Sequence, residues 1–507
     1  MSTPIAAMVH EPFGLSLSVM KIVTAFVIAY CFLLRPFYNL YLHPLHKFPG
    51  PKLWAASRTP NAWMTVSGRS AQTVLDLHRK YGDVIRTAPN ELSYVRADVW
   101  REVMGHRKSG QSENEKDQVH FAMFSNSIIG ASREDHSGVR RILSHGFSAR
   151  RMLEQQPLIR HYVDLLFKRL RENSAGGSQP LNVMEWFNYT TFDIIGDLAF
   201  GEPFGCLASS KLHPWVALVF KTVKQGNTLA AGRQLSPLAT EIVTFFMGNT
   251  VAGQLRQHWS LVCEKVAKRL SMTTERPDFI DSMTRKDKGN MTPEQIFENS
   301  NVLIIAGSET TATVMSFATY LLASHPHVMA RATEEVRAAF RTESDIDLLN
   351  VQSLRYLLAV LDEAMRMYPA VPGSQPRITP PEGQVICGDF VPKNTLLGIW
   401  QGAIFRYPGN FALPDEFISE RWLGEDPRFA GDKNEAFEPF SYGSRNCIGK
   451  NLAYSEMRMI LARLLFNYDI LLEEQSKGWA ENMKIYLIWE KPGLWVRLVP
   501  RITARSE

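Results

Sequence analysis

The chain has 507 residues, of which 45% are hydrophobic and 21% charged, as in an ordinary globular protein. Its formal net charge of +5 is small for this length, and no basic run with interleaved aromatic residues points to nucleic acid. The five cysteines are scattered without C-x-x-C spacing, which argues against a disulfide framework or a zinc site and favours a reducing compartment.

The N-terminal part of the chain contains an apolar stretch, Leu15–Leu34, after a tail formed by residues 1–14. About 20 apolar residues suffice to span a bilayer, and Lys21 lies toward one end, where it can reach the interface. No small-residue cleavage site follows, which disfavours a signal peptide. Because Lys and Arg are more frequent after the stretch than before it, we predict a single-span anchor with the rest of the chain in the cytosol. An interfacial helix is the alternative.

Residues 35–55 are rich in proline and predict a hinge, with the segment His43–Pro51 stiff and extended. No long low-complexity linker divides the chain after this point, so residues 56–507 are expected to form one large domain. Two short strand-like runs within Asp83–Val95 predict a hairpin.

The rest of the large domain has mostly helical patterns. Thr292-Pro293-Glu294-Gln295 combines an N-cap threonine, a proline in the first turn and a glutamine that closes a capping box, and the helix it begins can run to about Ser324. Other helices are expected over residues 134–171, 185–201, 213–231 and 236–271, and strands over 384–391, 395–400, 484–489 and 494–499, with Lys491-Pro492-Gly493 as the last turn. The predicted class is mainly α with minor β.

One cysteine lies in a glycine-bracketed loop, Phe440–Gly449, directly before an apolar helical run. Gly443 and Gly449 are expected to adopt backbone angles forbidden to other residues and to allow close approach of a large flat ligand. Backbone N–H groups near the helix start would stabilise a thiolate on Cys447, and Arg445 could pair with a carboxylate. Such a thiolate suits the axial position of a haem iron. A buried structural cysteine is the alternative.

The pattern Phe-x-x-Gly-x-Arg-x-Cys-x-Gly, from Phe440 to Gly449, resembles the signature of the cytochrome P450 family. The resemblance implies the cytochrome P450 fold, haem b as cofactor, and Cys447 as the axial ligand of its iron. It also implies an enzyme that inserts one atom of O2 into an apolar substrate and reduces the other to water, with Phe440 and Arg445 in the haem-binding loop.

The long central helix contains Ala306-Gly307-Ser308-Glu309-Thr310-Thr311. A glycine inside a helix costs about 1 kcal/mol relative to alanine, so Gly307 suggests close approach by something flat or room for a small molecule. Glu309 and Thr310 match the acid–alcohol pair of the family, which implies that they relay protons to dioxygen. Alternatively, Thr310 bonds to a carbonyl of its own helix and Glu309 is solvated.

Glu363-Ala364-Met365-Arg366 places an acid and an arginine three residues apart on an apolar helix, where buried charges need partners. The spacing matches the family's Glu-x-x-Arg motif, which implies a bracing triad with a later arginine, here Arg421.

Further haem contacts follow from the resemblance. Arg140 and Arg377 occupy positions where the family binds haem propionates, and with Arg445 they give three candidates for two carboxylates. The family usually has tryptophan four residues before Arg140; here His136 stands there, and its imidazole N–H could also donate to a carboxylate. Arg141 could share this role. A surface position is the alternative for Arg377.

The resemblance covers nearly the whole chain, and the segments Tyr38–Leu45 and His136–Ser148 are similar to fungal microsomal enzymes of secondary metabolism, of the isotrichodermin hydroxylase group. It implies an endoplasmic reticulum membrane protein that receives electrons from NADPH-cytochrome P450 reductase, with cytochrome b5 as a second donor. No dinucleotide fingerprint or flavin domain occurs in the chain itself. Lys450 and Arg458 could contact the reductase, or could be ordinary surface charges.

An apolar substrate pocket is expected on the distal side of the haem, which suggests a terpenoid or polyketide intermediate. Its candidate residues are Phe121, Phe124, Ile305, Val371 and Leu487. Two rival functions are a haem-thiolate isomerase or dehydratase that uses no O2, and a membrane-tethered haem sensor. The Glu309–Thr310 pair weighs against the first, because that chemistry needs no proton relay.

Overall fold

A long helix, α13 (Pro293–Ser324), runs through the middle of the molecule and is buried along most of its length. Its predicted start is confirmed: Thr292 Oγ1 accepts from the backbone N–H of Gln295 at 3.2 Å, and the Gln295 side chain accepts from the N–H of Thr292 at 3.0 Å. This computed structural model describes residues 17–108, 110–272, 276, 278–284, 291–481 and 483–501.

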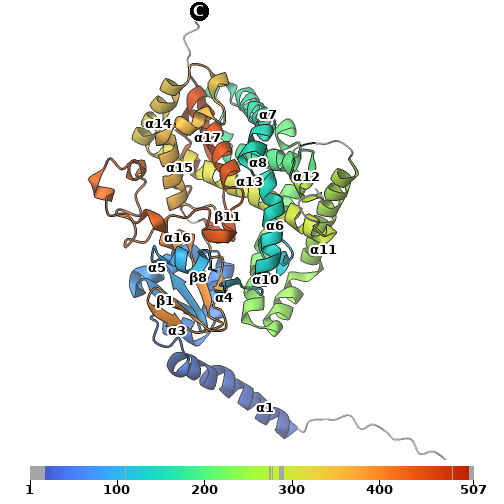
Figure 1. Cartoon of the computed structure of the whole chain (residues 1–507), viewed down its shortest axis with the longest axis vertical. Coiled ribbons are helices and arrows are strands. Elements are labelled where there is room, and N and C mark those ends of the chain that lie inside the picture. The colour runs from blue at the N-terminus through green and yellow to red at the C-terminus, as the bar shows by residue number, and fades with distance from the viewer. Residues whose placement is uncertain are drawn as a thin grey trace, which may run out of the picture.

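Helices surround α13 and form the larger part of the molecule (Figure 1). Against α13 pack α8 (Val183–Phe200), α11 (Pro237–Ser271), α14 (Pro326–Ala339), α15 (Arg355–Met367) and α17 (Lys450–Asn467). The outer helices are α6 (Arg133–Gly146), α7 (Ala149–Asn173), α9 (Cys206–Ser209), α10 (Pro214–Leu235) and α12 (Phe279–Thr284). The main apolar core lies between these helices.

A smaller, strand-rich part lies below the helices in Figure 1. Its five-stranded sheet has the order β1-β2-β8-β5-β3, and the predicted hairpin is its antiparallel β1–β2 pair. A second apolar core packs around this sheet. The strands are β1 (Val84–Ala88), β2 (Glu91–Tyr94), β3 (Glu115–Lys116), β5 (Arg377–Ile378) and β8 (Leu396–Ile399), beside α3 (Lys52–Ala56), α4 (Thr59–Ser67), α5 (Ser70–Tyr81) and α16 (Gln401–Ile404).

Three small sheets complete the β component. They are β6 (Gln384–Ile386) with β7 (Asp389–Val391), β10 (Lys484–Tyr486) with β11 (Ile488–Glu490), and β4 (Leu181–Asn182) with β12 (Trp495–Pro500) and β9 (Tyr468–Leu472). The class is therefore mainly α with minor β, as predicted. Two details differ from the prediction. The run 484–489, expected as one strand, forms parts of two strands, β10 and β11, that turn at Leu487 (φ 71°). The strand after the turn at 491–493, β12, pairs with β4 and β9, so this turn does not close a hairpin.

The helical patterns predicted over 134–171 form two helices. α6 ends at Gly146, and Ser148 begins α7 by accepting from the backbone N–H of Arg151 at 3.4 Å. A serine in this position satisfies a free N–H of the first turn, so it marks a helix start rather than a helix interior.

An N-terminal helical run projects away from the domain (Figure 1). It comprises α1 (Leu17–Ala29), η1 (Tyr30–Leu34), α2 (Arg35–Phe37) and η2 (Tyr38–Leu42), and Ser18–Leu42 is long and apolar enough to cross a membrane. The tail 1–14 and the first two residues of the predicted anchor lie outside the described residues.

The prediction that His43–Pro51 is extended is wrong for residues 43–48. Residues 43–48 form successive turns, in which the N–H of His46 donates to the carbonyl of His43 and that of Phe48 to Leu45. Leu45 and Phe48 are buried in the second core, so burial of these two apolar side chains outweighs the extended preference of the prolines.

Candidate functional site

The loop Phe440–Gly449 lies directly before α17 and contains η12 (Gly443–Arg445). Gly443 has φ 77°, and a Cβ on it would overlap the carbonyl oxygen of Met104, so both its backbone and its neighbour require glycine. The backbone N–H of Cys447 donates to the Phe440 carbonyl at 2.8 Å. Gly449 adopts an ordinary φ of −86°, contrary to the prediction, and the ideal Cβ at this position lies 3.9 Å from Cys447 Sγ.

The Cys447 thiol lies just before the first turn of α17, where several groups act on its pKa. Cys447 is exposed, yet the protein atoms packed around it raise the pKa of its thiol, while the Gly449 backbone N–H, Arg140 and Lys450 act in the opposite direction. These are the groups expected to favour a thiolate at a helix start. Coordination to a metal would remove the proton outright, because a coordinated thiol ionises.

Helix α6 supplies Arg140 and His136. Arg140 donates to Asn446 twice, from Nη1 to the backbone carbonyl at 2.6 Å and from Nη2 to Oδ1 at 2.5 Å. Arg140 thus holds the residue next to Cys447. His136 is buried, and burial together with nearby Arg445 and Arg140 lowers its pKa to about 3. It is therefore a neutral imidazole at physiological pH, able to donate one N–H.

Arg377 is buried rather than on the surface, with 3% of its side chain exposed, and so is Arg445. Both contact the carboxylate of Glu113, a residue that no motif indicated. Phe440 is half-buried, with its ring 5.0 Å from that of Tyr454 and the Lys450 ammonium 5.7 Å from its centroid.

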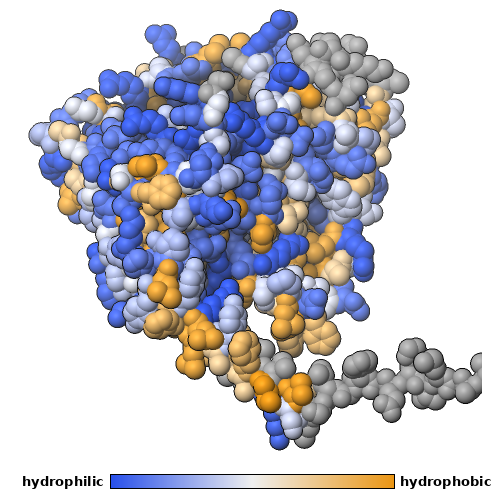
Figure 2. All heavy atoms as spheres, turned by 60° about the horizontal axis from the view of Figure 1, so that its bottom comes forward, coloured by the Kyte–Doolittle hydropathy of each residue, from blue (hydrophilic) through white to orange (hydrophobic). Residues whose placement is uncertain are grey.

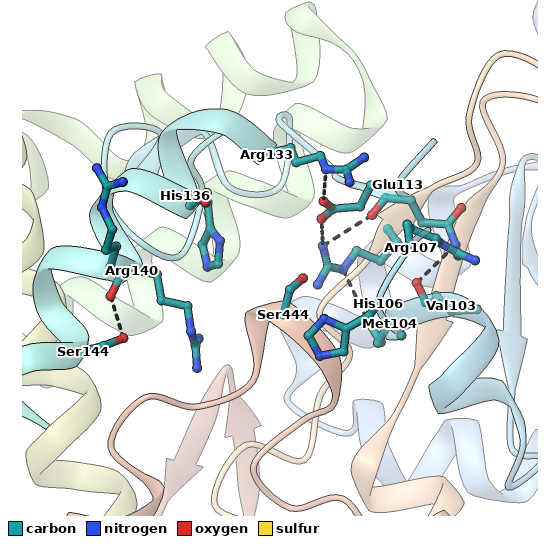
Figure 3. Close-up of a pocket in the computed structure, with 15 residues that line it drawn as sticks. Val103, Met104, His106, Arg107, Glu113, Arg133, His136, Arg140, Ser144 and Ser444 are labelled. Carbon is teal, nitrogen blue, oxygen red and sulfur yellow. Dashed lines mark hydrogen bonds and ion pairs between the residues drawn. The ribbon is translucent and has the colours of Figure 1, made fainter. Parts of the chain in front are cut away.

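A cavity of about 400 Å³ joins these elements. Figure 3 shows His136 and Arg140 on one side, Arg107 and Glu113 on the other, and Ser444 between them. Arg133, Arg141 and Arg377 also line it, and Glu113 is the single acidic residue among the described lining residues. A cavity with this excess of guanidinium groups suits a ligand with carboxylates.

For Thr310 the structure shows the alternative, a hydroxyl bonded to its own helix, whereas Glu309 is buried rather than solvated. Glu309 is buried, and its carboxylate meets Lys491 Nζ, while Thr313 Oγ1 donates to Glu309 Oε1 at 3.2 Å. Glu309 Oε2 has no hydrogen-bond partner within the described part of the chain. Thr310 Oγ1 donates to the Ala306 carbonyl at 2.6 Å.

Gly307 is explained by helix packing. A Cβ at this position would lie 2.6 Å from Ile195 Cδ1 on α8, a separation that real side chains do not adopt. The close approach predicted at Gly307 is therefore made, in the direction of its missing Cβ, by a side chain of a neighbouring helix.

The bracing network predicted from Glu-x-x-Arg is confirmed. Arg366 Nε and Nη2 each donate to the Glu363 carboxylate at 2.8 Å, and Arg421 Nε donates to Glu363 Oε1 at 3.1 Å. The side chains of Glu363 and Arg366 are fully buried. Sequence reasoning missed two members: Asp432 accepts from Arg421 Nη1 at 2.5 Å, and Trp422 Nε1 donates to Glu363 Oε2 at 2.9 Å.

The chain matches the family model described as Cytochrome P450 over residues 49–496. It belongs to the cytochrome P450 family. It is 46% identical to a trichothecene C-15 hydroxylase of Fusarium sporotrichioides over 92% of this chain and 95% of that protein. It is also 42% identical to an averantin hydroxylase of Dothistroma septosporum over 93% and 89%, and to the cytochrome P450 monooxygenase astJ of Aspergillus oryzae over 92% and 94%.

This cytochrome P450 is accordingly a haem-thiolate monooxygenase that uses O2 and a redox partner, similar to enzymes of fungal secondary metabolism. Its relatives support neither the isomerase nor the sensor. The residues present fit a haem: a thiol beside a helix start, and two buried arginines that each keep Nη2 without a partner in the described part of the chain.

Sequence reasoning missed Glu113, Asn446 and Lys491. Asn446 lies within the cysteine loop, so its place next to Cys447 was a usable signal. Glu113 and Lys491 lie far along the chain from their partners, and no spacing rule connects them.

Proposed function

We propose that this cytochrome P450 hydroxylates, epoxidises or oxidises in several steps a small apolar secondary-metabolite intermediate of terpenoid or polyketide type. One atom of O2 enters the substrate and the other leaves as water, with electrons from NADPH-cytochrome P450 reductase. The observation that carries this proposal is the Cys447 thiol at the start of α17, close to the Gly449 N–H and Arg140, in a chain 46% identical to a trichothecene hydroxylase. A trichothecene and averantin, the compounds in two relatives' names, support a substrate class rather than one compound.

Cys447 would be the axial ligand of the iron of haem b. When bound, the haem supplies the activation of dioxygen, which thiolate donation favours. Arg140, Arg377, Arg445 and His136 would hold the propionates. Arg377 and Arg445 would do so through their Nη2 atoms, which have no partner among the described residues, and His136 through an imidazole N–H. Phe440 would pack beside the thiolate.

Glu309 and Thr310 would move protons to dioxygen. The Oε2 of Glu309, which has no hydrogen-bond partner in the described part of the chain, would be the oxygen that serves the relay, and the Lys491 contact fixes the opposite oxygen. For Thr310 to donate to dioxygen, its hydroxyl must leave the Ala306 carbonyl, an exchange of one hydrogen bond for another that costs about 1 kcal/mol or less.

The substrate pocket would be lined by apolar side chains from separate segments. Phe121 is buried, whereas the other candidates are half-buried, which suits side chains that border a space; they are Phe124, Ile305, Val371 and Leu487. None of them borders the arginine-rich cavity of Figure 3, so substrate and propionates would occupy different regions.

The reductase would dock on the face that bears Cys447, with cytochrome b5 as a second donor at the same face. Lys450, exposed at the start of α17, is the stronger candidate contact. Arg458 is half-buried, and its guanidinium lies 5.1 Å from the Tyr454 ring centroid, so it offers less of its charge to a partner.

Residues 15–34 would anchor the protein in the endoplasmic reticulum membrane as a single span, with the domain in the cytosol. Two observations support a membrane at this end: Ser18–Leu42 is apolar enough to cross one, and hydrophobic residues gather where this helix leaves the domain (Figure 2). Strongly exposed apolar side chains on α4 and α11, next to α10, are Trp63, Leu238, Phe245 and Phe246.

The carbon monoxide difference spectrum of the dithionite-reduced protein tests the site, with Cys447→Ala as the variant and Cys31→Ala as the control. We expect the strongly red-shifted Soret band of a thiolate-ligated haem in the wild type and in Cys31→Ala, and its loss in Cys447→Ala. A folded wild type without this band would refute the thiolate assignment.

Reconstitution with reductase tests the reaction. With NADPH, O2 and a panel of apolar terpenoids and polyketides, product carrying one oxygen from labelled O2 is expected. Turnover of a panel member without NADPH would contradict the monooxygenase proposal.

A further inference from the structure

A carboxylate outside every sequence motif joins two of the arginines assigned to the haem site. Glu113 lies between η3 (Trp100–Met104) and β3, and 14% of its side chain is exposed. Its Oε1 accepts from Arg445 Nε at 2.6 Å and from Arg377 Nη1 at 3.4 Å. Oε2 lies 3.7 Å from Arg133 Nε, the contact drawn in Figure 3.

The remaining donors of the two buried arginines are mostly fixed as well. Arg445 Nη1 donates to the Ala131 carbonyl at 2.9 Å, while Arg377 contacts Met104 Sδ through Nε at 3.1 Å and the Asn114 carbonyl through Nη1 at 3.4 Å. On each guanidinium only Nη2 lacks a partner among the described residues. Glu113 thus fixes one edge of both groups and leaves the other edge free for a carboxylate of a ligand.

The charge of Glu113 matters because so many cations converge here. Burial and the neighbouring Arg445 lower the pKa of Arg377 to about 10, and Glu113 acts against that shift. Lys116 is buried nearby. Burial and the same two arginines lower its pKa, and Glu113 again acts against that shift. Two guanidiniums held side by side repel each other unless an anion lies between them.

We propose that Glu113 is a positioning residue of the haem site, which holds Arg445 and Arg377 together with their Nη2 atoms available to the propionates. This inference rests on the proposed haem site. Glu113 also places a fixed negative charge beside the propionates, and such a charge disfavours the gain of an electron by the iron.

The test uses the purified holoprotein and two readouts that need no turnover: the rate of haem transfer to apomyoglobin and the midpoint potential of the haem iron. For Glu113→Gln we expect haem loss to become about tenfold faster, since hydrogen bonds between charged groups are lost, and the potential to become more positive. Glu113→Asp keeps the charge and should hold the potential at the wild-type value.

Glu115→Gln is the matched control, because Glu115 is an exposed acid two residues away on β3. It should change neither readout. Unchanged haem loss and potential in Glu113→Gln would overturn the proposal, and so would slower haem loss, which would mean that Glu113 competes with the propionates. A wild type without a thiolate-type carbon monoxide spectrum would instead refute the proposed function itself.

Discussion

Lys491 and Glu309 form a buried ion pair between the turn after β11 and the middle of α13, with only 3% of each side chain exposed. Thr313 bridges them, since its hydroxyl accepts from Lys491 Nζ at 2.8 Å and donates to Glu309 Oε1. The pair ties the proposed proton-relay acid to a segment 182 residues away in the sequence.

Replacing Lys491 with methionine should leave the Glu309 charge buried and unpaired. We expect Lys491→Met to lower the free energy of unfolding by about 3–5 kcal/mol. The double variant Lys491→Met with Glu309→Gln should recover most of this loss, because it removes both charges. Urea unfolding of the wild type, the two single variants and the double variant gives the coupling free energy between the two side chains.

Lys484→Met is the control for that cycle, because Lys484 is exposed on β10. Its effect should stay within about 0.5 kcal/mol. Equal losses in both methionine variants would mean that the buried pair contributes no special stability.

Thr310→Ala should leave haem content unchanged but divert reducing equivalents to peroxide, because the proposed hydroxyl donor to dioxygen is gone. The ratio of peroxide formed to NADPH consumed is the measurement. Ser316→Ala removes a hydroxyl from the same helix with the same bond to the carbonyl four residues earlier, at 2.7 Å. It should keep the wild-type ratio, and tight coupling in Thr310→Ala would remove Thr310 from the relay.

Arg366→Lys should fail to preserve the bracing network. Besides pairing with Glu363, the Arg366 guanidinium donates to the carbonyls of Phe405, Pro414 and Glu416 at 3.1, 2.7 and 3.0 Å. A lysine ammonium cannot reach this planar set of acceptors. We expect a loss of about 2 kcal/mol or more in the free energy of unfolding, and a lower yield of holoprotein.

Arg428→Lys is the comparison for Arg366→Lys, because Arg428 forms an exposed pair with Asp426. Exposed pairs contribute little, so this change should be nearly neutral. A holoprotein yield for Arg366→Lys equal to that of Arg428→Lys would show that charge alone suffices at position 366.

Glu456, buried on α17, should make stability depend on pH. Burial raises its pKa from 4.5 to about 8, so between these values the unfolded chain releases a proton that the folded chain keeps. The contribution of Glu456 to the free energy of unfolding is largest below pH 4.5. It falls as the pH rises to about 8, by at most about 1.4 kcal/mol per pH unit.

Glu456→Gln cannot ionise and should therefore be less sensitive to pH across this window than the wild type. Urea unfolding at several pH values gives the two slopes, with Glu334→Gln, an exposed residue of α14, as the reference. Identical slopes in wild type and Glu456→Gln would mean that Glu456 is paired or hydrated in solution.

Local signals in the sequence predicted the elements whose causes are local. The capping box at Thr292 starts α13 because its two hydrogen bonds lie within four consecutive residues. The hairpin β1–β2 likewise follows from alternation and a short turn. The cysteine loop was identifiable because its glycines, Arg445 and Cys447 act at fixed spacing.

The sequence failed where distant segments decide the outcome. The prolines of 43–51 predict an extended segment, yet burial of Leu45 and Phe48 folds it into turns. Gly307 was attributed to close approach by something flat or to room for a small molecule, but the Ile195 side chain of α8 occupies the space where its Cβ would lie. A residue pattern states what a segment prefers and not what will pack against it.

The sequence by itself therefore determined the family, the class of reaction, the starts of several helices and the Glu363–Arg366 pair, because each depends on residues close together in the chain or at a recurring spacing. Only the tertiary structure decided which charges meet. Glu113 joins Arg445 across 332 residues, and Lys491 joins Glu309. Buried charges take whichever partner the folded chain brings within hydrogen-bond distance, and that partner is set by packing rather than by position in the sequence.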